Sequence, residues 1–571
     1  MTIPQHISNL ANHSNHESRL GGHILADQLR LLGVDTLFCV PGESFLYLLD
    51  GLYEHTDSIK TVVCRHEGGA SNMADAYAKM TGRPGVCAVT RGPGATNASN
   101  GIHTAFQDSS PMIVLIGQVE SGMMDREAFQ EMDYRRVFGQ MAKWVAQIED
   151  ASRIPEYLSR AWKVACSGRP GPVVLALPEN VLSDRAVATD LKPGTIEPPA
   201  PTTTSIANLG KMLHQAQRPM LLVGGPGWSE SCKNKTMAFA ERMGIPVITS
   251  LRCQDYVDNS HPNYVGVMGI APSPQLRKRV AEEVDLLIVV GSRLGEMTTQ
   301  GYSLVSIPNP QMDFVHVHPD ASELGHVYNP TLGIVSSALE FFTALESLAD
   351  GEGRTRWADW VHEQREDYLA FCQPTEVPGD LNMSRVIRHI TQTMPDNTLL
   401  TNGAGNYTVW GHRFHQHRSY RTQLAPTSGS MGYAVPAAIA AKLVSPDQPV
   451  ISLSGDGCFL MTAQEMATAR KYNANVIYLV VNNSMYGTIR MHQERHHPQR
   501  MIATDLVNPD FVTYAAAFGI DGERVVNTSD FPAALARARE AANGYLIELI
   551  VDEQALTPTQ TLDEITQQGL G

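Results

Sequence analysis

The chain has 571 residues, which is more than one hydrophobic core can organise and predicts roughly three or four domains. Its composition is that of a globular protein, and a net charge of −15 without a Lys/Arg-rich run argues against nucleic acid or an anionic membrane as the main partner. No apolar run approaches the length that crosses a bilayer, and eight scattered cysteines without a C-x-x-C pair predict reduced thiols in a cytoplasmic protein.

The first block follows a polar segment, residues 1–20, that we expect to be a loose arm. Between residues 21 and 189, short apolar runs alternate with helical stretches. These runs predict parallel strands buried on both faces, at residues 36–40, 61–64, 86–90, 112–116 and 173–177. The Pro-rich segment 190–201 is then predicted to be a linker.

A second block of the same kind covers residues 202–349, with predicted strands at 220–223, 247–249, 286–290 and 314–317. A connector containing Pro374 and Pro378 leads to a third block, residues 380–555, and a tail follows at 556–571. Three such blocks of comparable size predict an α/β fold with three doubly wound parallel-sheet domains.

The most informative stretch, residues 450–490, lies in the third block. An apolar run ends at Gly455-Asp456-Gly457, a helical stretch through Glu465 and Tyr472 follows, and a second apolar run ends at Asn482-Asn483. This order of elements predicts a parallel strand-helix-strand unit with its polar residues at the carboxyl ends of both strands. Open α/β sheets bind their ligands at such ends.

The residue types at these ends indicate the ligand. Asp456 offers an anionic oxygen and Asn483 a neutral amide oxygen, which suit Mg²⁺ or Ca²⁺ better than zinc. Gly455 and Gly457 let the backbone approach a ligand closely, and a helix start offers N–H groups to an anion. The stretch therefore predicts a seat for a metal-bridged diphosphate.

Glu67 is the second candidate. It follows the apolar run 61–64 and opens a helical stretch in which Ala70, Ala74 and Ala78 form a face of small residues. A carboxylate at a helix start also complements the helix dipole, so on its own Glu67 needs no chemical role.

The GDG motif followed across one helix by Asn-Asn resembles the thiamin diphosphate (ThDP) signature. RHEGGASNMADAYAKMTGRPG, RGPGATNASNGIHTAFQDSSPMIVLIGQV and APTSGSMGYAVPAAIAAKL extend this likeness to nearly the whole chain. The chain resembles the acetolactate synthase large subunit and its relatives, the ThDP-dependent 2-oxo acid decarboxylases. The resemblance implies an amino-terminal pyrimidine-binding domain, a central domain and a carboxy-terminal diphosphate-binding domain.

By this resemblance Glu67 is the catalytic glutamate, which would hydrogen-bond the aminopyrimidine ring of ThDP. The metal ligands would be Asp456, Asn483 and the carbonyl of Met485. Gln118 and His492 are the other predicted catalytic residues, His492 because it stands where synthases usually place a specificity-setting Trp. The residues implied in cofactor binding are Pro93, Asn97, Gly405, Asn406, Met431, Gly455, Asp456, Gly457, Cys458, Asn483 and Tyr486.

The family also implies a homodimer with active sites shared between subunits, commonly assembled into a homotetramer. Two segments depart from the synthase pattern. Leu251-Arg252-Cys253-Gln254-Asp255 replaces a Met-Gly-Leu-Gly-like stretch and brings charge towards the expected site. Residues 290–293 are similar to a flavin-contacting region, but residues 267–271 lack the expected His-Gly pair. FAD is therefore an open alternative that the sequence does not favour.

The resemblance implies a ThDP- and Mg²⁺-dependent enzyme that decarboxylates 2-oxo acids and ligates the product to a second carbonyl. Three alternatives remain: a simple decarboxylase of a longer or more polar 2-oxo acid, a non-catalytic regulatory paralogue, and a flavin-linked oxidase. The His-rich stretches, with His412, His415 and His417 in one and His492, His496 and His497 in the other, are predicted to be solvated or interface histidines.

Overall fold

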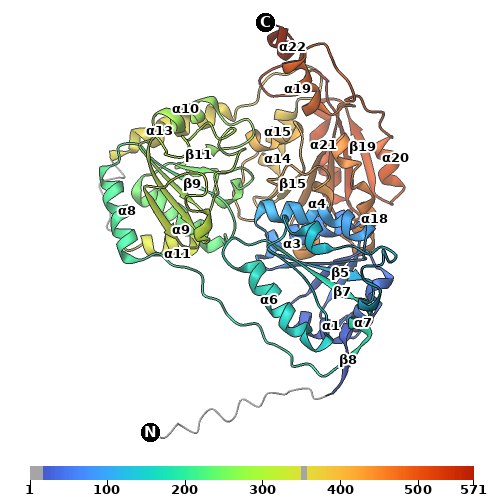
Figure 1. Ribbon diagram of the computed structural model, residues 1–571. Helices are drawn as coiled ribbons and strands as arrows, with labels where there is room; N and C mark the ends of the chain where they lie inside the picture. Colours follow the sequence, from blue (N-terminus) through green and yellow to red (C-terminus); the bar gives the residue numbers. More distant parts are fainter. Residues whose placement is uncertain (1–16, 349–355, 571) are drawn as a thin grey trace, which may run out of the picture.

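The computed structural model describes residues 17–348 and 356–570, which form three α/β domains (Figure 1). Each domain contains one six-stranded, fully parallel sheet. The predicted α/β class with three parallel-sheet domains is confirmed. Most of the predicted arm, residues 1–16, lies outside the described residues, while β1 (Arg19–Leu20) pairs with β8 (Arg185–Ala186).

The amino-terminal sheet has the order β3-β2-β4-β5-β7-β6. Its central strand β5 shows why such strands are continuously apolar. Met112, Val114 and Ile116 enter one hydrophobic cluster, and Ile113 and Leu115 enter another on the opposite face. The strands are β2 (Thr36–Cys39), β3 (Lys60–Val63), β4 (Gly85–Val89), β5 (Met112–Gln118), β6 (Trp144–Gln147) and β7 (Pro172–Pro178); the main helices are α1 (Gly21–Leu31), α2 (Leu46–Tyr53), α3 (Glu67–Thr81), α4 (Pro93–Asp108), α5 (Tyr134–Phe138), α6 (Ile154–Cys166) and α7 (Glu179–Ser183).

The central sheet has the order β11-β10-β9-β12-β13-β14 and a hydrophobic core of its own. Its strands are β9 (Pro219–Val223), β10 (Val247–Thr249), β11 (Tyr264–Val267), β12 (Leu286–Val290), β13 (Asp313–His318) and β14 (Leu332–Val335); its helices are α8 (Thr203–Gln215), α9 (Glu230–Met243), α10 (Pro274–Glu282) and α11 (Ala338–Leu345), followed by α13 (Ala358–Phe371).

The carboxy-terminal sheet has the order β16-β15-β17-β18-β20-β19. Its strands are β15 (Leu399–Asn402), β16 (Gln423–Leu424), β17 (Val450–Gly455), β18 (Ile477–Asn482), β19 (Asp521–Val525) and β20 (Tyr545–Ile550). Its helices are α14 (Met383–Thr393), α15 (Tyr407–Phe414), α16 (Ala434–Val444), α17 (Asp456–Phe459), α18 (Met466–Tyr472), α19 (Gly487–His496), α20 (Phe511–Ala516), α21 (Phe531–Glu540) and α22 (Leu562–Leu570).

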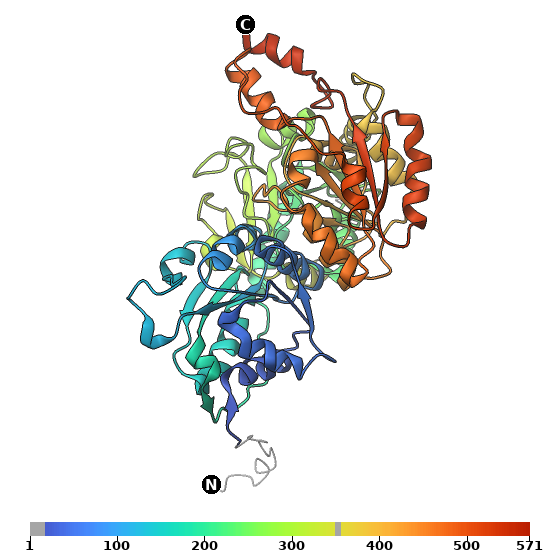
Figure 2. The ribbon, with the colours of Figure 1, turned by 90° about the vertical axis from the view of Figure 1, so that its right-hand side faces the viewer.

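Helices α3 and α16 join the first and last domains, which Figure 2 shows as neighbours. Ala70 and Ala74 of α3 lie in the same hydrophobic cluster as Ala437 and Ala441 of α16. The small side chains predicted along this helix thus bring two helices into close contact. Polar groups reinforce the contact, because the Tyr433 hydroxyl donates to the buried carboxylate of Asp75 at 2.6 Å.

No helix in the described part of the chain is both long and apolar enough to span a membrane.

Candidate functional site

The strand order of the carboxy-terminal sheet creates a binding edge. The chain passes from β15 outwards to β16 and then returns to the other side of β15 to form β17. The loops that follow β15 and β17 therefore diverge and leave a crevice at their carboxyl ends, where open α/β sheets bind ligands. Gly455 ends β17 beside Val481 of β18, so the GDG and Asn-Asn motifs lie at this same edge.

Asp456 is a buried carboxylate at this edge. Its Oδ1 accepts from the amide of Gly457 at 2.9 Å, and its Oδ2 accepts from the Asn508 side chain at 2.8 Å. Burial raises the pKa of Asp456, and within the described residues this carboxylate forms no ion pair with a basic side chain. A buried anion without a cation is costly, so the site suits a metal ion that would supply the missing positive charge.

The segment after β18 folds back beside Asp456. Ser484 has a positive φ of 54°, which bends the chain so that the Asn483 Oδ1 accepts from the Met485 amide at 3.3 Å. The predicted ligands Asn483 and Met485 thus belong to one tight turn. Gly457 must lack a side chain here, because a Cβ would stand 2.5 Å from the Tyr486 ring.

Cys458 connects the other segments that line this edge of the sheet. Its Sγ accepts from the Gly432 amide at 3.1 Å and contacts the Tyr407 hydroxyl at 3.2 Å, and that hydroxyl accepts from the Gly403 amide at 3.1 Å. The segments around Met431, after β15 and after β17 are joined by these bonds. We call residues 403–406, 430–432, 455–458 and 482–486 the diphosphate seat, after the ligand that the sequence predicts for them. Asn406, in the first of these segments, accepts from Thr488 at 2.8 Å.

Glu67 lies in the amino-terminal domain as the first residue of α3. Its side chain is buried, its Oε2 accepts from Asn97 at 3.0 Å, and a Cβ on Gly94 would stand 3.2 Å from its Oε1. The structure therefore brings Glu67 together with Asn97 and with the start of α4, where Pro93 is the first residue. Gln118 is buried at the end of β5, but its amide bonds Met132 and Val119 rather than this group.

Sequence reasoning missed the role of Glu465. The stretch 461–472, predicted to be one helical stretch, is instead divided between a 3₁₀ turn (Ala463–Glu465) and α18. This break lets the buried carboxylate of Glu465 accept from the Arg65 and His66 amides at 3.0 Å each and from Thr468 at 2.6 Å. Glu465 thus anchors the two residues before Glu67 to the other domain, a long-range contact that no local pattern signals.

Within one chain, Glu67 and Asp456 have separate hydrogen-bond partners. Glu67 bonds Asn97 of its own domain, whereas Asp456 bonds Gly457 and Asn508. Asn508, which carries no motif and was not predicted, also donates to Asn482 at 3.0 Å. No hydrogen bond joins Glu67 to Asp456 among the described residues, although Ser430 donates to Asn100 of α4 at 2.7 Å.

The histidines divide into two groups. His412, His415 and His417 are buried, so of the two predicted alternatives, solvated or interface histidines, the solvated one is wrong for them. The reason is that α15 ends at Phe414 and the next residues run between domains, where the His417 amide donates to Asn259 at 3.0 Å. His492 is exposed on α19 and stacks on His496, so its contact with a substrate remains a prediction.

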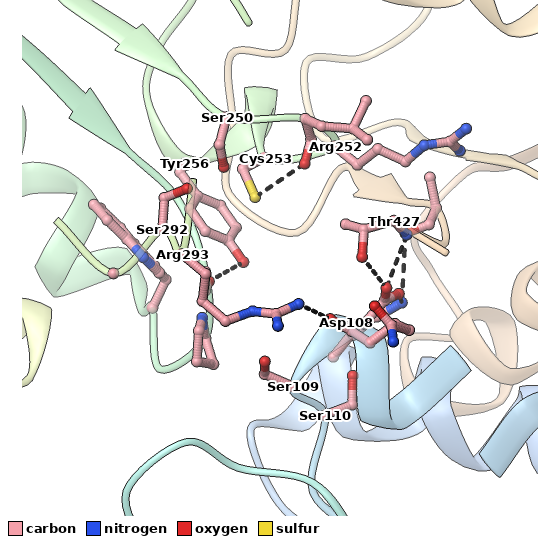
Figure 3. A pocket seen from close by; sticks show the side chains of 18 of the residues that line it. Asp108, Ser109, Ser110, Ser250, Arg252, Cys253, Tyr256, Ser292, Arg293 and Thr427 are labelled. Carbon is pink, nitrogen blue, oxygen red and sulfur yellow. Dashed lines mark hydrogen bonds and ion pairs between the residues drawn. The ribbon is translucent and has the colours of Figure 1, made fainter. Parts of the chain in front are cut away.

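A cavity of about 660 Å³ lies where the three domains meet (Figure 3). It opens at the carboxyl ends of β9 and β12, between which the strand order of the central sheet reverses. Gly225 has a φ of 74°, and a Cβ there would stand 1.9 Å from the Gly291 carbonyl. The predicted flavin-like segment forms part of this wall, and Arg293 donates across it to Gln107 at 2.8 Å. Such a switch point suits a nucleotide-sized ligand, and FAD stays an alternative that the sequence does not favour.

Family models match all three domains. They describe a thiamine pyrophosphate enzyme N-terminal TPP binding domain at residues 19–137, a central domain at 206–345 and a C-terminal TPP binding domain at 403–549. The chain therefore belongs to the thiamine pyrophosphate enzyme family; thiamine pyrophosphate is another name for ThDP.

Curated relatives narrow this class. An acetolactate synthase large subunit from Parasynechococcus marenigrum is 31% identical, over 93% of this chain and 87% of the relative. Another acetolactate synthase large subunit, from Corynebacterium glutamicum, is 32% identical over 94% of this chain and 88% of the relative. The acetolactate synthase isozyme 2 large subunit from Escherichia coli is 28% identical over 93% of this chain and 96% of the relative. The chain is thus a ThDP-dependent enzyme of the acetolactate synthase-like kind, as its motifs predicted.

Proposed function

We propose that the diphosphate seat holds ThDP through a divalent metal ion bound by Asp456, Asn483 and the Met485 carbonyl. The observation that carries this proposal is the buried Asp456 carboxylate, which has no basic partner in the described chain and lies at the reversal of the sheet. Mg²⁺ is the preferred ion, because it binds few protein oxygens and completes its shell with phosphate and water.

Calorimetric titration with ThDP tests this proposal. Uptake should require Mg²⁺ and should fall at least tenfold in Asp456→Asn, which keeps the shape and removes the charge. Uptake of ThDP that is independent of added metal in a chelator-treated protein would contradict the metal assignment.

Glu67 is proposed to act on the aminopyrimidine ring of the cofactor. ThDP, when bound, supplies a nucleophilic ring carbon and a sink for the electrons released by decarboxylation. Glu67 is held in place by Asn97 and by the anchored residues before α3, and its burial keeps water from competing for the ring nitrogen. Glu67→Gln should therefore lose most turnover, by ~10²-fold or more, while it retains ThDP binding.

The family resemblance supports a homodimer in which Glu67 of one chain faces the diphosphate seat of its partner, and within one chain Glu67 makes no hydrogen bond to Asp456. Large apolar side chains are exposed on both domains, with Phe129 on the amino-terminal domain and Leu460, Met461 and Ile502 on the carboxy-terminal domain. A homotetramer of two such dimers is the expected assembly. Light scattering of the active, cofactor-bound enzyme tests this, and a monomer would refute it.

Carboligation of 2-oxo acids is the proposed reaction, because the curated relatives are named as acetolactate synthases. A simple decarboxylase of a more polar 2-oxo acid is the second candidate, favoured by Arg252, which the synthase pattern lacks and which lies buried beside the seat. Product analysis with pyruvate alone separates the two: acetolactate or acetoin indicates carboligation, and acetaldehyde indicates decarboxylation. CO₂ release from a panel of 2-oxo acids, compared with Glu67→Gln, also tests for a non-catalytic paralogue.

A further inference from the structure

Arg252 is a buried arginine without an acidic partner in the described residues. The other two buried arginines, Arg91 and Arg490, are ion-paired with Glu179 and Asp505. Arg252 makes a single hydrogen bond, from Nη1 to the Gly403 carbonyl at 2.8 Å, and its Nε and Nη2 have no partner among the described residues. Burial lowers its pKa to about 10, which leaves the guanidinium charged at neutral pH.

A buried charge is costly unless it is paired, so an Arg252 with two unpartnered nitrogens points to a partner outside the described chain. Asp108, whose charge acts on Arg252, is already ion-paired with Lys79. Arg252 also has a φ of 62°, a strained conformation for a residue other than glycine, in the turn after β10 from which its side chain reaches Gly403.

The neighbouring residues fix this turn against the same domain. Gln254 donates to the His412 carbonyl at 2.9 Å, and the Asp255 carboxylate accepts from the Thr422 and Gln423 amides at 3.0 and 3.2 Å. The central domain is thus docked through residues 252–255, and Arg252 is the member of this segment that reaches the diphosphate seat. In Figure 3 the side chains of Arg252 and Arg293 extend from two different segments of the central domain.

Gly403, the acceptor for Arg252, is packed into the seat. A Cβ on Gly403 would stand 2.6 Å from the Cys458 Sγ and 3.3 Å from the Ser430 carbonyl. Its amide also donates to the Tyr407 hydroxyl that contacts Cys458. The guanidinium therefore bonds Gly403, which itself packs against the seat segments 430–432 and 455–458. Little water is present there to screen its charge.

We propose that Arg252 is a positioning residue for the cofactor: it holds the Gly403 segment and supplies a buried positive charge that favours the diphosphate. This inference rests on the proposed function. The charge balance of the seat supports it, because a diphosphate together with Asp456 carries more negative charge than one divalent cation neutralises. The guanidinium acts across the Gly403 segment, without direct contact to the reacting atoms.

The test measures the Kd of ThDP with saturating Mg²⁺ in three variants. Arg252→Met should raise the Kd about tenfold, equivalent to ~1.4 kcal/mol, whereas Arg252→Lys should keep most of the affinity because it keeps the charge. Arg413→Met is the matched control: Arg413 lies on α15, is partly buried, and also donates to a main-chain carbonyl, that of Phe371 at 2.7 Å. It should bind ThDP as the wild type does.

Two further readouts separate charge from packing. The ThDP-free Arg252→Met protein should melt no lower than Arg413→Met, because the mutation removes an unpaired buried charge. The affinity difference should also persist at high salt, since a buried charge is poorly screened. Unchanged ThDP affinity in Arg252→Met, or equal losses in the Lys and Met variants, would overturn the inference while the proposed function stands. Failure of the wild type to bind ThDP would refute both.

Discussion

Replacing Glu465 with alanine removes the acceptor that holds the start of α3 against the carboxy-terminal domain. The Arg65 and His66 amides lose their acceptor, and the Thr468 hydroxyl keeps only the Val63 carbonyl at 3.4 Å. Both amides are part-buried and lose a hydrogen bond to a carboxylate, which contributes about 1–3 kcal/mol each, so the two predict a loss of about 2–6 kcal/mol in local stability. Because these residues precede Glu67, turnover should fall as well.

Hydrogen exchange of the Arg65 and His66 amides measures this effect directly. A loss of 2 kcal/mol corresponds to an acceleration of about 30-fold, which is the smallest change that the structure predicts for Glu465→Ala. Glu465→Gln keeps one oxygen acceptor in the same place and should restore most of the protection. Equal exchange in Glu465→Ala and the wild type, or equal acceleration in the Ala and Gln variants, would refute the reasoning.

Three other predictions concern Gly69 beside Glu465, the buried histidines His412 and His415, and the exposed His492. Gly69→Ala should lower the melting temperature, because its Cβ would stand 2.3 Å from the Glu465 Oε1, and the loss should be smaller in a Glu465→Ala background. Burial lowers the pKa of His412 to about 3 and of His415 to about 4, so unfolded chains gain protons below about pH 6.5 that the folded chain excludes. The contribution of these two histidines to the free energy of unfolding should therefore be full above pH 6.5. It should fall as the pH drops towards 4, by ~1.4 kcal/mol per pH unit for each ring, and the stability of His415→Gln should depend less steeply on pH in thermal melts. His492→Ala should alter turnover with 2-oxo acids and leave ThDP affinity intact; unchanged kinetics with every accepted 2-oxo acid would exclude the proposed specificity role.

Several strands that are buried on both faces were predicted because they form continuous apolar runs, but the buried interior strands β15 and β20 were not. The runs at 112–116 and 286–290 coincide with β5 and β12. By contrast, β14 and β19 are partly exposed edge strands with mixed sequences, and they were missed. The strand ends carrying the GDG and Asn-Asn motifs were predictable because both the residues and the turns are local.

The contacts of Glu465 and Arg252 could not be predicted in this way. Glu465 accepts from residues about 400 positions earlier in the chain, and Arg252 bonds a residue of another domain. Periodicity shows only that Glu465 lies on a helical stretch, and composition shows only that Arg252 is charged. Their burial and their partners follow from how the domains pack, which local patterns in the sequence do not reveal.

The shared hydrophobic cluster between α3 and α16 has an evolutionary consequence. The first and last domains have to be inherited together, because separating them would expose an alanine-rich face on each. The central domain has its own core and could be exchanged for another module through the segments that flank it. A graft of this kind would remove Arg252, so a chimaera with a foreign middle domain should require more cofactor to reach full occupancy.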